Sequence, residues 1–339
     1  MASQLAGLIV PQIFGQTVLE DSIQKNVLTA SGIIPVDPYM SSLLAGAGQI
    51  FTFPTLVNPD LAGTAANVPT GDSATQATPE VITGRSQKFV KNARNRAFNI
   101  NGLVTNVIGT DPLDAVVSAT SLMINQWRQK SLIAQLNGLL DPATGVAKAN
   151  TTKIASESVA AQGTGTKIST NPTSSIIDAL YIAWGDAGTG DTVLIMHSDV
   201  WRTIAKTNTT AFMPPAVQHP QFQSFLGYPV LVDDNLGKRA GTTDGSVYTV
   251  YAIKAGGVKF GYTPDAKPFE VLAQPLQGNG AGGEVAVARD WFGYHVVGTS
   301  FTGSAAGDVP TDAELATMAK WGLTFPNKAV GIAALVCNL

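Results

Sequence analysis

Three histidines are the side chains of this chain best suited to acid–base or metal chemistry, and their spacing argues against both. None of His197, His219 and His295 has a second histidine or a cysteine at the separation that a metal motif requires. The single cysteine, Cys337, excludes a disulfide within the chain. His197 falls between an expected strand and an expected helix, where a structural histidine is more common than a catalytic one. We therefore expect no catalytic residue, no metal and no cofactor.

The glycine-rich and acidic motifs are incomplete or misplaced. Gly278, Gly280 and Gly283 match the GxGxxG pattern, but the segment that follows predicts a strand where a dinucleotide site requires a helix. No segment completes a nucleophile elbow or a phosphate loop. The carboxylates of Asp233 and Asp234 follow an expected strand, on which they would point to opposite faces. The chain is therefore expected not to be an enzyme, and a hydrolase with an unrecognised site is the least favoured alternative.

A cluster of basic residues is the charge feature that points to a contact. It places five positive charges within twelve positions and has no acidic residue between them: Arg85, Lys88, Lys91, Arg94 and Arg96. Because the whole chain has a net charge of −3, the rest of it carries −8. We favour a docking strip for a neighbouring subunit, ahead of a solvated strand face and of nucleic acid. Phe51 and Phe53, on an expected strand earlier in the chain, complete the predicted subunit interface.

The composition is poor in charge for a soluble protein. Charged residues make up 13% of the 339 positions, against about 25% in typical domains. Since isolated proteins normally keep a charged surface, self-assembly that covers this surface is one explanation. An extracellular domain with a Ser/Thr/Gly-rich exterior is the other. A pI near 5.6 argues against a nucleic-acid binder with one large basic surface.

Signals for export or membrane insertion are not evident in the sequence. No lysine or arginine precedes Lys25, so the basic region of a signal peptide is missing. The longest apolar run, residues 329–337, is too short to span a bilayer. We expect a soluble protein that is made in the cytosol.

The first 110 residues predict an arm followed by an extended excursion. Residues 1–45 form the arm, with a helix near residues 18–28. Two prolines end that helix: Pro35 and Pro38. Residues 46–110 predict two long strands, and the segment 63–80 between them is almost bare of large apolar residues, which predicts an exposed tip. Such a finger has little core of its own and needs a neighbour to pack on.

A long helix and a central sheet are predicted for the rest of the chain. The helix covers residues 111–140, with Asp111 as N-cap and Pro112 in the first helical position, and is roughly 40 Å long. Residues 141–171 predict loops or a weak hairpin. Helices are expected over 174–184, 198–206 (with Ser198 as N-cap) and 312–319. Strands are expected over 192–197, 228–232, 247–253, 256–262, 269–273 and 329–336, and residues 284–301 are expected to form one long strand or two. This is an α+β pattern.

Several segments resemble the major capsid proteins of tailed bacteriophages. In the central region, MHSDVW at 196–201 precedes FLGYPV at 225–230. A strand–helix pair followed by such a Gly-x-Pro-Val strand is typical of the axial domain of these proteins. Near the C-terminus, the resemblance extends to RDWFGYH at 289–295, GTSF at 298–301 and KAVGIA at 328–333. The order of elements, rather than a single motif, carries the resemblance over nearly the whole chain.

The resemblance implies the tailed-phage major capsid fold, of the α+β class, which encapsulin shells share. It implies five segments: an N-terminal arm over 1–45, an extended loop with flanking strands over 46–110, a spine helix with part of the peripheral domain over 111–174, an axial domain over 175–290, and return strands and a helix of the peripheral domain over 291–339.

The implied function is that of a structural shell subunit. It would self-assemble through pentamers and hexamers into the icosahedral virion head around double-stranded DNA, in the cytoplasm of a bacterial host. The implied partners are further copies of itself, scaffolding, portal and decoration proteins, and packaged DNA by proximity only, with no membrane. Two alternatives stay open: an encapsulin-like nanocompartment shell, and a secreted structural or adhesive surface protein.

Overall fold

The structure is a computed structural model, and it describes residues 28, 33–56, 71, 76, 84–101, 112–155, 167–169, 171–207, 212–213, 223–236, 238–240, 246–265, 267–303 and 309–339. The α-helices are α2 (Pro38–Leu44), α4 (Pro112–Leu139), α6 (Pro172–Trp184), α7 (Ser198–Thr207) and α8 (Asp312–Leu315). The strands are β1 (Ile50–Leu56), β2 (Gly84–Val90), β3 (Asn92–Asn101), β4 (Thr151–Lys153), β5 (Thr192–Met196), β6 (Phe212–Met213), β7 (Gln223–Phe225), β8 (Tyr228–Val232), β9 (Lys238–Ala240), β10 (Ser246–Lys254), β11 (Val258–Thr263), β12 (Phe269–Ala273), β13 (Gly283–Val296), β14 (Thr299–Phe301), β15 (Trp321–Leu323) and β16 (Ile332–Cys337).

Two compact units divide these elements. The smaller unit contains described residues from Arg94–Trp127 and Pro264–Asp290. The larger unit contains those from Asn26–Ala93, Arg128–Thr263 and Trp291–Leu339. The boundaries of these two compact units do not test the five segments expected from the sequence, so those segments remain a prediction.

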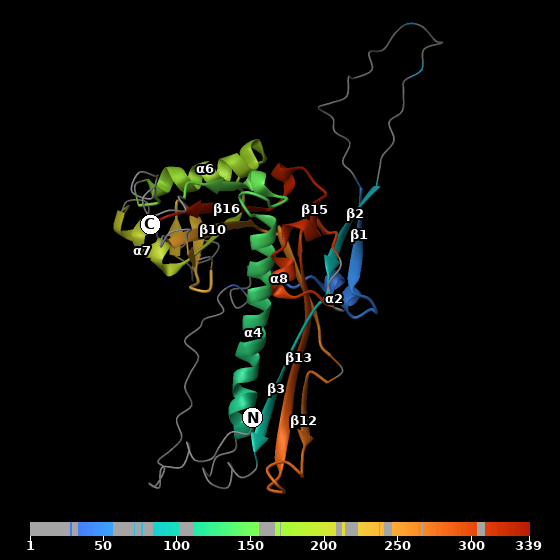
Figure 1. Ribbon diagram of the computed structural model, residues 1–339. Helices are drawn as coiled ribbons and strands as arrows, with labels where there is room; N and C mark the ends of the chain where they lie inside the picture. The colour runs from blue at the N-terminus through green and yellow to red at the C-terminus, as the bar shows by residue number, and fades with distance from the viewer. Residues whose placement is uncertain are drawn as a thin grey trace. The chain divides into compact units, whose positions relative to one another are not determined.

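A mixed sheet of eight strands is the frame of the larger unit (Figure 1). Its order is β4-β16-β10-β5-β8-β7-β6, with β9 beside β10. β5 runs parallel to β8, and β16 runs parallel to β4, while the other strand pairs of this sheet are antiparallel. β5 and β16 are buried at every position, and apart from Thr192 at the start of β5 their residues are apolar, as is typical of strands covered on both faces.

The two faces of this sheet carry separate apolar cores. Because side chains alternate along a strand, Val193 and Ile195 of β5 belong to one core, and Leu194 and Met196 belong to the other. The first core includes four side chains from the C-terminal end of α4: Leu132, Ile133, Leu136 and Leu139. The second core includes the buried side chains of α6 and α7. Helices therefore cover the sheet on both faces.

The long helix predicted over residues 111–140 is confirmed as α4. Pro112 is its first residue, as the sequence predicts, whereas Asp111 lies outside the described residues. The helix has 28 residues, so it is about 42 Å long. Along the parts of the chain that the structure describes, no helix is long and apolar enough to cross a membrane.

A sheet in which β13 pairs with β3 and with β12 is the frame of the smaller unit (Figure 1). The turn between β12 and β13 contains Gly278 and Gly280 of the GxGxxG motif, both with positive φ, and Gly283 is the first residue of β13. A strand follows the motif, as predicted, so it does not start a dinucleotide-binding helix. The segment predicted as one long strand or two over 284–301 is two strands, β13 and β14, with Gly298 at φ 92° between them.

Pro38 begins a helix, α2, that was not predicted from the sequence, from which we expected only that this proline ends an upstream helix. Asp37 occupies the N-cap of α2, and its side chain accepts the backbone N–H groups of Tyr39 and Met40. A proline in the first helical position needs no N–H, so the sequence pattern was compatible with either outcome. The helix expected near 18–28 lies outside the described residues except Leu28, and the tip over 63–80 lies outside them except positions 71 and 76.

The remaining expected elements agree with the structure apart from their ends. β8 and β12 coincide with the predicted ranges, and α6 begins two residues earlier than predicted. The helix predicted over 312–319 is shorter, because α8 gives way to a 3₁₀ turn over Met318–Lys320. Within 141–171, the described strand β4 pairs with β16 in parallel, so the weak hairpin predicted there is not formed by β4.

Candidate assembly surfaces

The two strands predicted for the excursion pair as an antiparallel hairpin base, β1 with β2. The rings of Phe51 and Phe53 stack on Phe89, with centroids 5.4 and 4.9 Å apart. All three belong to an apolar cluster that also holds Met40 and Leu44 of α2. The structure thus places both phenylalanines in packing within the subunit, and their part in a subunit interface remains a prediction.

A buried polar contact connects β2 to β13 beside this cluster. Nε2 of His295 lies 2.8 Å from Oε1 of Gln87, and the backbone N–H of Gly298 donates to the same oxygen at 2.9 Å. Because that oxygen accepts from Gly298, Nε2 of His295 carries the proton. Burial lowers the pKa of His295 from 6.5 to about 4, and the positive charge of Lys259 acts in the same direction. His295 is therefore a neutral packing residue at pH 7.

Two glycines allow α2 to lie directly against β11 and β13. Gly261 and Gly293 are cross-strand partners. A Cβ atom on Gly261 would lie 2.9 Å from Cγ of Met40 and 3.1 Å from Cδ1 of Leu44. The side chains of α2 therefore occupy the space that a larger residue would fill. This close approach positions α2, and with it the apolar cluster under the hairpin base.

Lys91, in the middle of the predicted basic strip, lies inside the subunit. It is 6% exposed, its Nζ donates to the carbonyl oxygen of Leu44 at 2.8 Å, and the same nitrogen lies 4.1 Å from the ring centroid of Trp291. Because Leu44 is the last residue of α2, the ammonium group satisfies a carbonyl at the helix C-terminus. Lys91 is therefore not an exposed member of the predicted basic strip.

The other four basic residues divide between the two units. Arg85 and Lys88 lie on β2 in the larger unit, and Arg94 and Arg96 lie on β3 in the smaller one. Arg85 also donates to a backbone carbonyl of its own unit at 2.7 Å. Arg85, Lys88 and Arg96 are exposed, and Arg94 is partly exposed. A contact of these four side chains with a neighbouring subunit remains a prediction.

His197 lies at the start of a helix, where it acts as a cap. It occupies the cap position of α7, which corrects the prediction that Ser198 is the N-cap, and its Nδ1 accepts the backbone N–H of Asp199 at 3.1 Å. Its ring meets the ring of Tyr248 edge-on, with centroids 5.3 Å apart. The hydroxyl of Tyr248 donates to Asp199 at 3.0 Å, and this hydrogen bond lowers the pKa of Asp199. These contacts fix the start of α7.

The adjacent carboxylates after β8 point apart, as the sequence predicts. Asp233 is buried and accepts a hydrogen bond from Nε2 of Gln129 at 2.6 Å. Asp234 is exposed and accepts the backbone N–H of Ser198 at 3.1 Å. Each carboxylate thus has its own structural contact. Within the described part of the chain, no three His, Cys, Asp or Glu side chains gather as a metal site would require.

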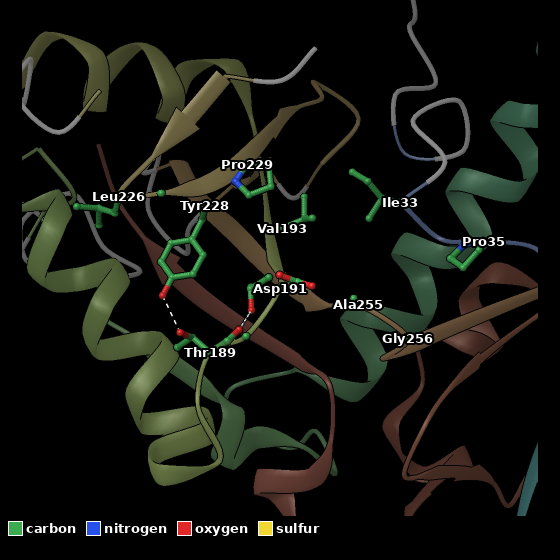
Figure 2. Close-up of a pocket in the computed structure, with 13 residues that line it drawn as sticks. Ile33, Pro35, Thr189, Asp191, Val193, Leu226, Tyr228, Pro229, Ala255 and Gly256 are labelled. Atoms are coloured by element: carbon green, nitrogen blue, oxygen red, sulfur yellow. Dashed lines mark hydrogen bonds between the residues drawn. The ribbon is translucent and has the colours of Figure 1, made fainter. Parts of the chain in front are cut away.

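A pocket of about 490 Å³ lies where three turns of the larger unit meet (Figure 2). These turns precede β5, join β7 to β8, and join β10 to β11. The hydroxyl of Tyr228 donates to Oγ1 of Thr189 at 2.8 Å and so connects two of the turns. The lining contains one carboxylate, Asp191, and contains no histidine, cysteine, lysine or arginine. The pocket therefore offers no pairing of a nucleophile or acid with a basic side chain.

Sequence comparisons identify relatives along nearly the whole chain. Residues 86–254 match the model of the phage capsid family. Over 331 residues, the chain is 25% identical to the major capsid protein of Bacillus phage SPP1, and this match covers 97% of the chain and 96% of that protein. The relative thus has the same extent as this chain.

Solved structures show the same fold at low sequence identity. The capsid asymmetric unit of cyanophage Pam1 gives a TM-score of 0.60 at 11% identity, with 99% of this chain and 98% of that chain covered. A structure from Mycobacterium phage Bobi gives a TM-score of 0.55 at 14% identity, with 98% and 96% covered. The tailed-phage major capsid fold expected from the sequence is thereby confirmed.

The family match and the SPP1 relative favour one of the three interpretations that the sequence left open, that of a phage shell, and the fold is consistent with it. The chain belongs to the phage capsid family and is a structural subunit of a phage head.

Proposed function

We propose that copies of this chain, arranged in pentamers and hexamers, form the closed icosahedral head that encloses double-stranded DNA. The observation that carries this proposal is the similarity to a major capsid protein over 97% of the chain. A subunit of such a shell acts by contact alone, so the chain itself catalyses no reaction. Its low charged fraction of 13% supports the proposal, because a surface that neighbours cover needs little charge.

Exposed apolar side chains on several surfaces also support assembly. Leu56 at the end of β1 is 77% exposed, and Ile182 on α6 is 61% exposed. Tyr181 lies beside Ile182 and is likewise exposed. Monomeric proteins expose few contiguous apolar patches, whereas the interfaces of permanent assemblies tolerate apolar surface. A shell subunit is expected to have such surfaces on more than one side, because it has neighbours on each side.

Contact with the packaged DNA is proposed to be by proximity only. Phosphate contacts dominate nucleic-acid affinity, and a net charge of −3 argues against one large basic surface that would make them. A weakly attractive inner surface would allow the DNA to leave the head. We place assembly in the cytoplasm of the bacterial host, with scaffolding, portal and decoration proteins as the proposed partners beside further copies of the chain.

Deletion of residues 63–80 tests whether the excursion reaches a neighbouring subunit. The full-length chain and the deletion variant, closed by a short Gly-Ser turn, are compared by sedimentation under conditions in which the full-length chain forms particles. Because residues 63–80 are almost bare of large apolar residues, we expect the variant to remain a folded subunit by circular dichroism. We expect it to form no particles, because the proposed contact of the excursion with a neighbour is lost. Normal particles from the variant would show that the excursion is not an assembly element.

A further inference from the structure

One edge of β12, in the sheet of the smaller unit, has no partner strand among the described residues. The backbone N–H of Arg289 donates to the carbonyl oxygen of Pro268, and that of Gln274 donates to Gly283. In an antiparallel pair, positions that bond to the partner strand alternate with positions that point away from it. Even-numbered residues from 268 to 274 therefore face β13. The backbone groups of three residues point outward: Phe269, Val271 and Ala273.

The side chains of β12 are exposed on both faces of the sheet. Val271 is 38% exposed and Leu272 is 48% exposed, and adjacent residues of a strand point to opposite faces. An apolar strand that is open along one edge and on both faces readily pairs with another strand. A protein that stays monomeric normally blocks such an edge, so an open edge indicates that something covers it.

The outer edge of β1, by contrast, is blocked. The backbone N–H of Lys91 donates to the carbonyl oxygen of Gln49 at 2.9 Å. By the same alternation, Pro54 occupies a position of β1 that points away from β2. Proline has no N–H to donate, and its placement on an outer edge prevents pairing with a further strand. The outward positions of β12 contain neither proline nor a charged residue.

The sequence of β12 is complementary to a second copy of itself. If two copies pair in antiparallel fashion about a two-fold axis at Val271, each Val271 lies opposite the other and Phe269 lies opposite the Ala273 of the second copy. The outward-pointing backbone groups of these three residues then lie opposite the outward-pointing backbone groups of the second copy. The side chains of these residues form one apolar row on one face of the joined sheets, an arrangement that stabilises strand pairs.

The charge on β12 does not oppose this pairing. Glu270 would lie opposite Leu272 of the second copy, so the two glutamates do not face each other directly. Within its own subunit, Glu270 lies 2.8 Å from Nζ of Lys267 and 3.2 Å from Nη1 of Arg289. These two cations offset the carboxylate when a second strand covers it.

The pairing also fits the geometry of a shell. A two-fold axis between directly opposed residues of antiparallel strands is perpendicular to the sheet, so the same face of both sheets lies on the same side. Subunits of a closed shell must keep one face inward in this way. We infer that β12 is a docking strand through which two copies of the chain join their sheets edge to edge, with Val271 at the two-fold axis. This inference rests on the proposed shell function and adds one specific contact to it.

A single cysteine tests the two-fold axis. In particles assembled from full-length chain carrying Val271→Cys, each new thiol faces its own equivalent. The Cα atoms of such a pair lie about 5.5 Å apart, which suits a disulfide, and the natural Cys337 is buried. After oxidation, we expect a covalent dimer on a non-reducing denaturing gel. Leu276→Cys is the control, because Leu276 is 89% exposed and would lie roughly 30 Å from its equivalent.

A second variant tests the need for the edge. Val271→Pro removes one outward N–H and leaves the hydrogen bonds between β12 and β13 in place. We expect the soluble subunit to keep its circular dichroism spectrum and the particle yield to fall at least tenfold. The β12 contact would be overturned if the Val271→Cys variant gave no more covalent dimer than the Leu276→Cys variant. It would also be overturned if the folded Val271→Pro variant formed particles normally. Neither result would contradict the shell function. Wild-type chain that never forms particles would overturn the shell function and this contact together.

Discussion

His295 is buried as a neutral side chain beside the aromatic rings of the hairpin base. Its ring lies 5.1 Å from the ring of Phe53, centroid to centroid, and its Nε2 donates to Gln87. Protonation would place a positive charge in this apolar site without a carboxylate partner among its described contacts, which is why burial lowers the pKa to about 4. Acidic pH is therefore expected to lower the stability of the folded chain at the hairpin base.

This sensitivity gives a prediction for the pH dependence of stability. Because the pKa of His295 is about 4 in the folded chain and about 6.5 when unfolded, the unfolded chain binds more protons between these values. Stability is thus full above pH 6.5 and falls as the pH drops towards 4, by on the order of 3 kcal/mol. Urea unfolding at pH 7 and pH 4 should show this loss, and His295→Gln should reduce it by about that amount. If the His295→Gln variant lost as much stability between pH 7 and pH 4 as the wild-type chain, His295 would not be the cause of the loss.

Among the elements, α2 shows how a short helix can organise a larger region. It lies on the glycine pair of β11 and β13, its C-terminal carbonyl accepts from Lys91, and its apolar side chains pack with the rings of β1 and β2. Asp37 at its N-cap lies 3.0 Å from Nζ of Lys259. Burial acts to raise the pKa of Asp37, but Lys259 and the N–H groups of the helix bring it below its usual value.

Gly261→Ala should therefore be destabilising even though alanine is compatible with a strand. The new Cβ would lie 2.9 Å from Cγ of Met40 and 3.0 Å from the backbone nitrogen of Ser41, and overpacking of this kind costs about 1–3 kcal/mol. Gly84→Ala, on the exposed start of β2, is the matched control, because its nearest neighbour would be 3.9 Å away. Urea unfolding should separate the two variants. A control variant as unstable as Gly261→Ala would show that the space around Gly261 is not the cause.

The sequence predicts the elements that local signals delimit, and it fails where distant residues decide. α4 is predictable because an Asp-Pro pair opens a long helical pattern, and β8 because Gly227 in the preceding turn is followed by a run of mostly apolar residues. The burial of Lys91 is not predictable, because the carbonyl and the aromatic ring that receive it come from α2 and β13. The open edge of β12 likewise cannot be predicted before the strand order is known, because the sequence of the strand does not say which edge lacks a neighbour.

For the whole molecule, the shell function that the comparisons support depends on surfaces that neighbouring subunits can contact. Three side chains that could have done chemistry, His197, His295 and Asp233, each make structural contacts among the described residues, and His219 lies outside those residues. Exposed apolar side chains lie at the end of β1, on α6 and on β12. A contact on any one surface can be modest, because closing a shell makes the contacts multivalent.

Electron microscopy of the purified full-length chain, produced alone and together with a scaffolding protein, tests whether the chain builds a closed shell. We predict closed shells of uniform size whose subunits cluster in rings of five and six. A chain that stays monomeric under both conditions, and forms neither rings nor shells, would contradict the shell function.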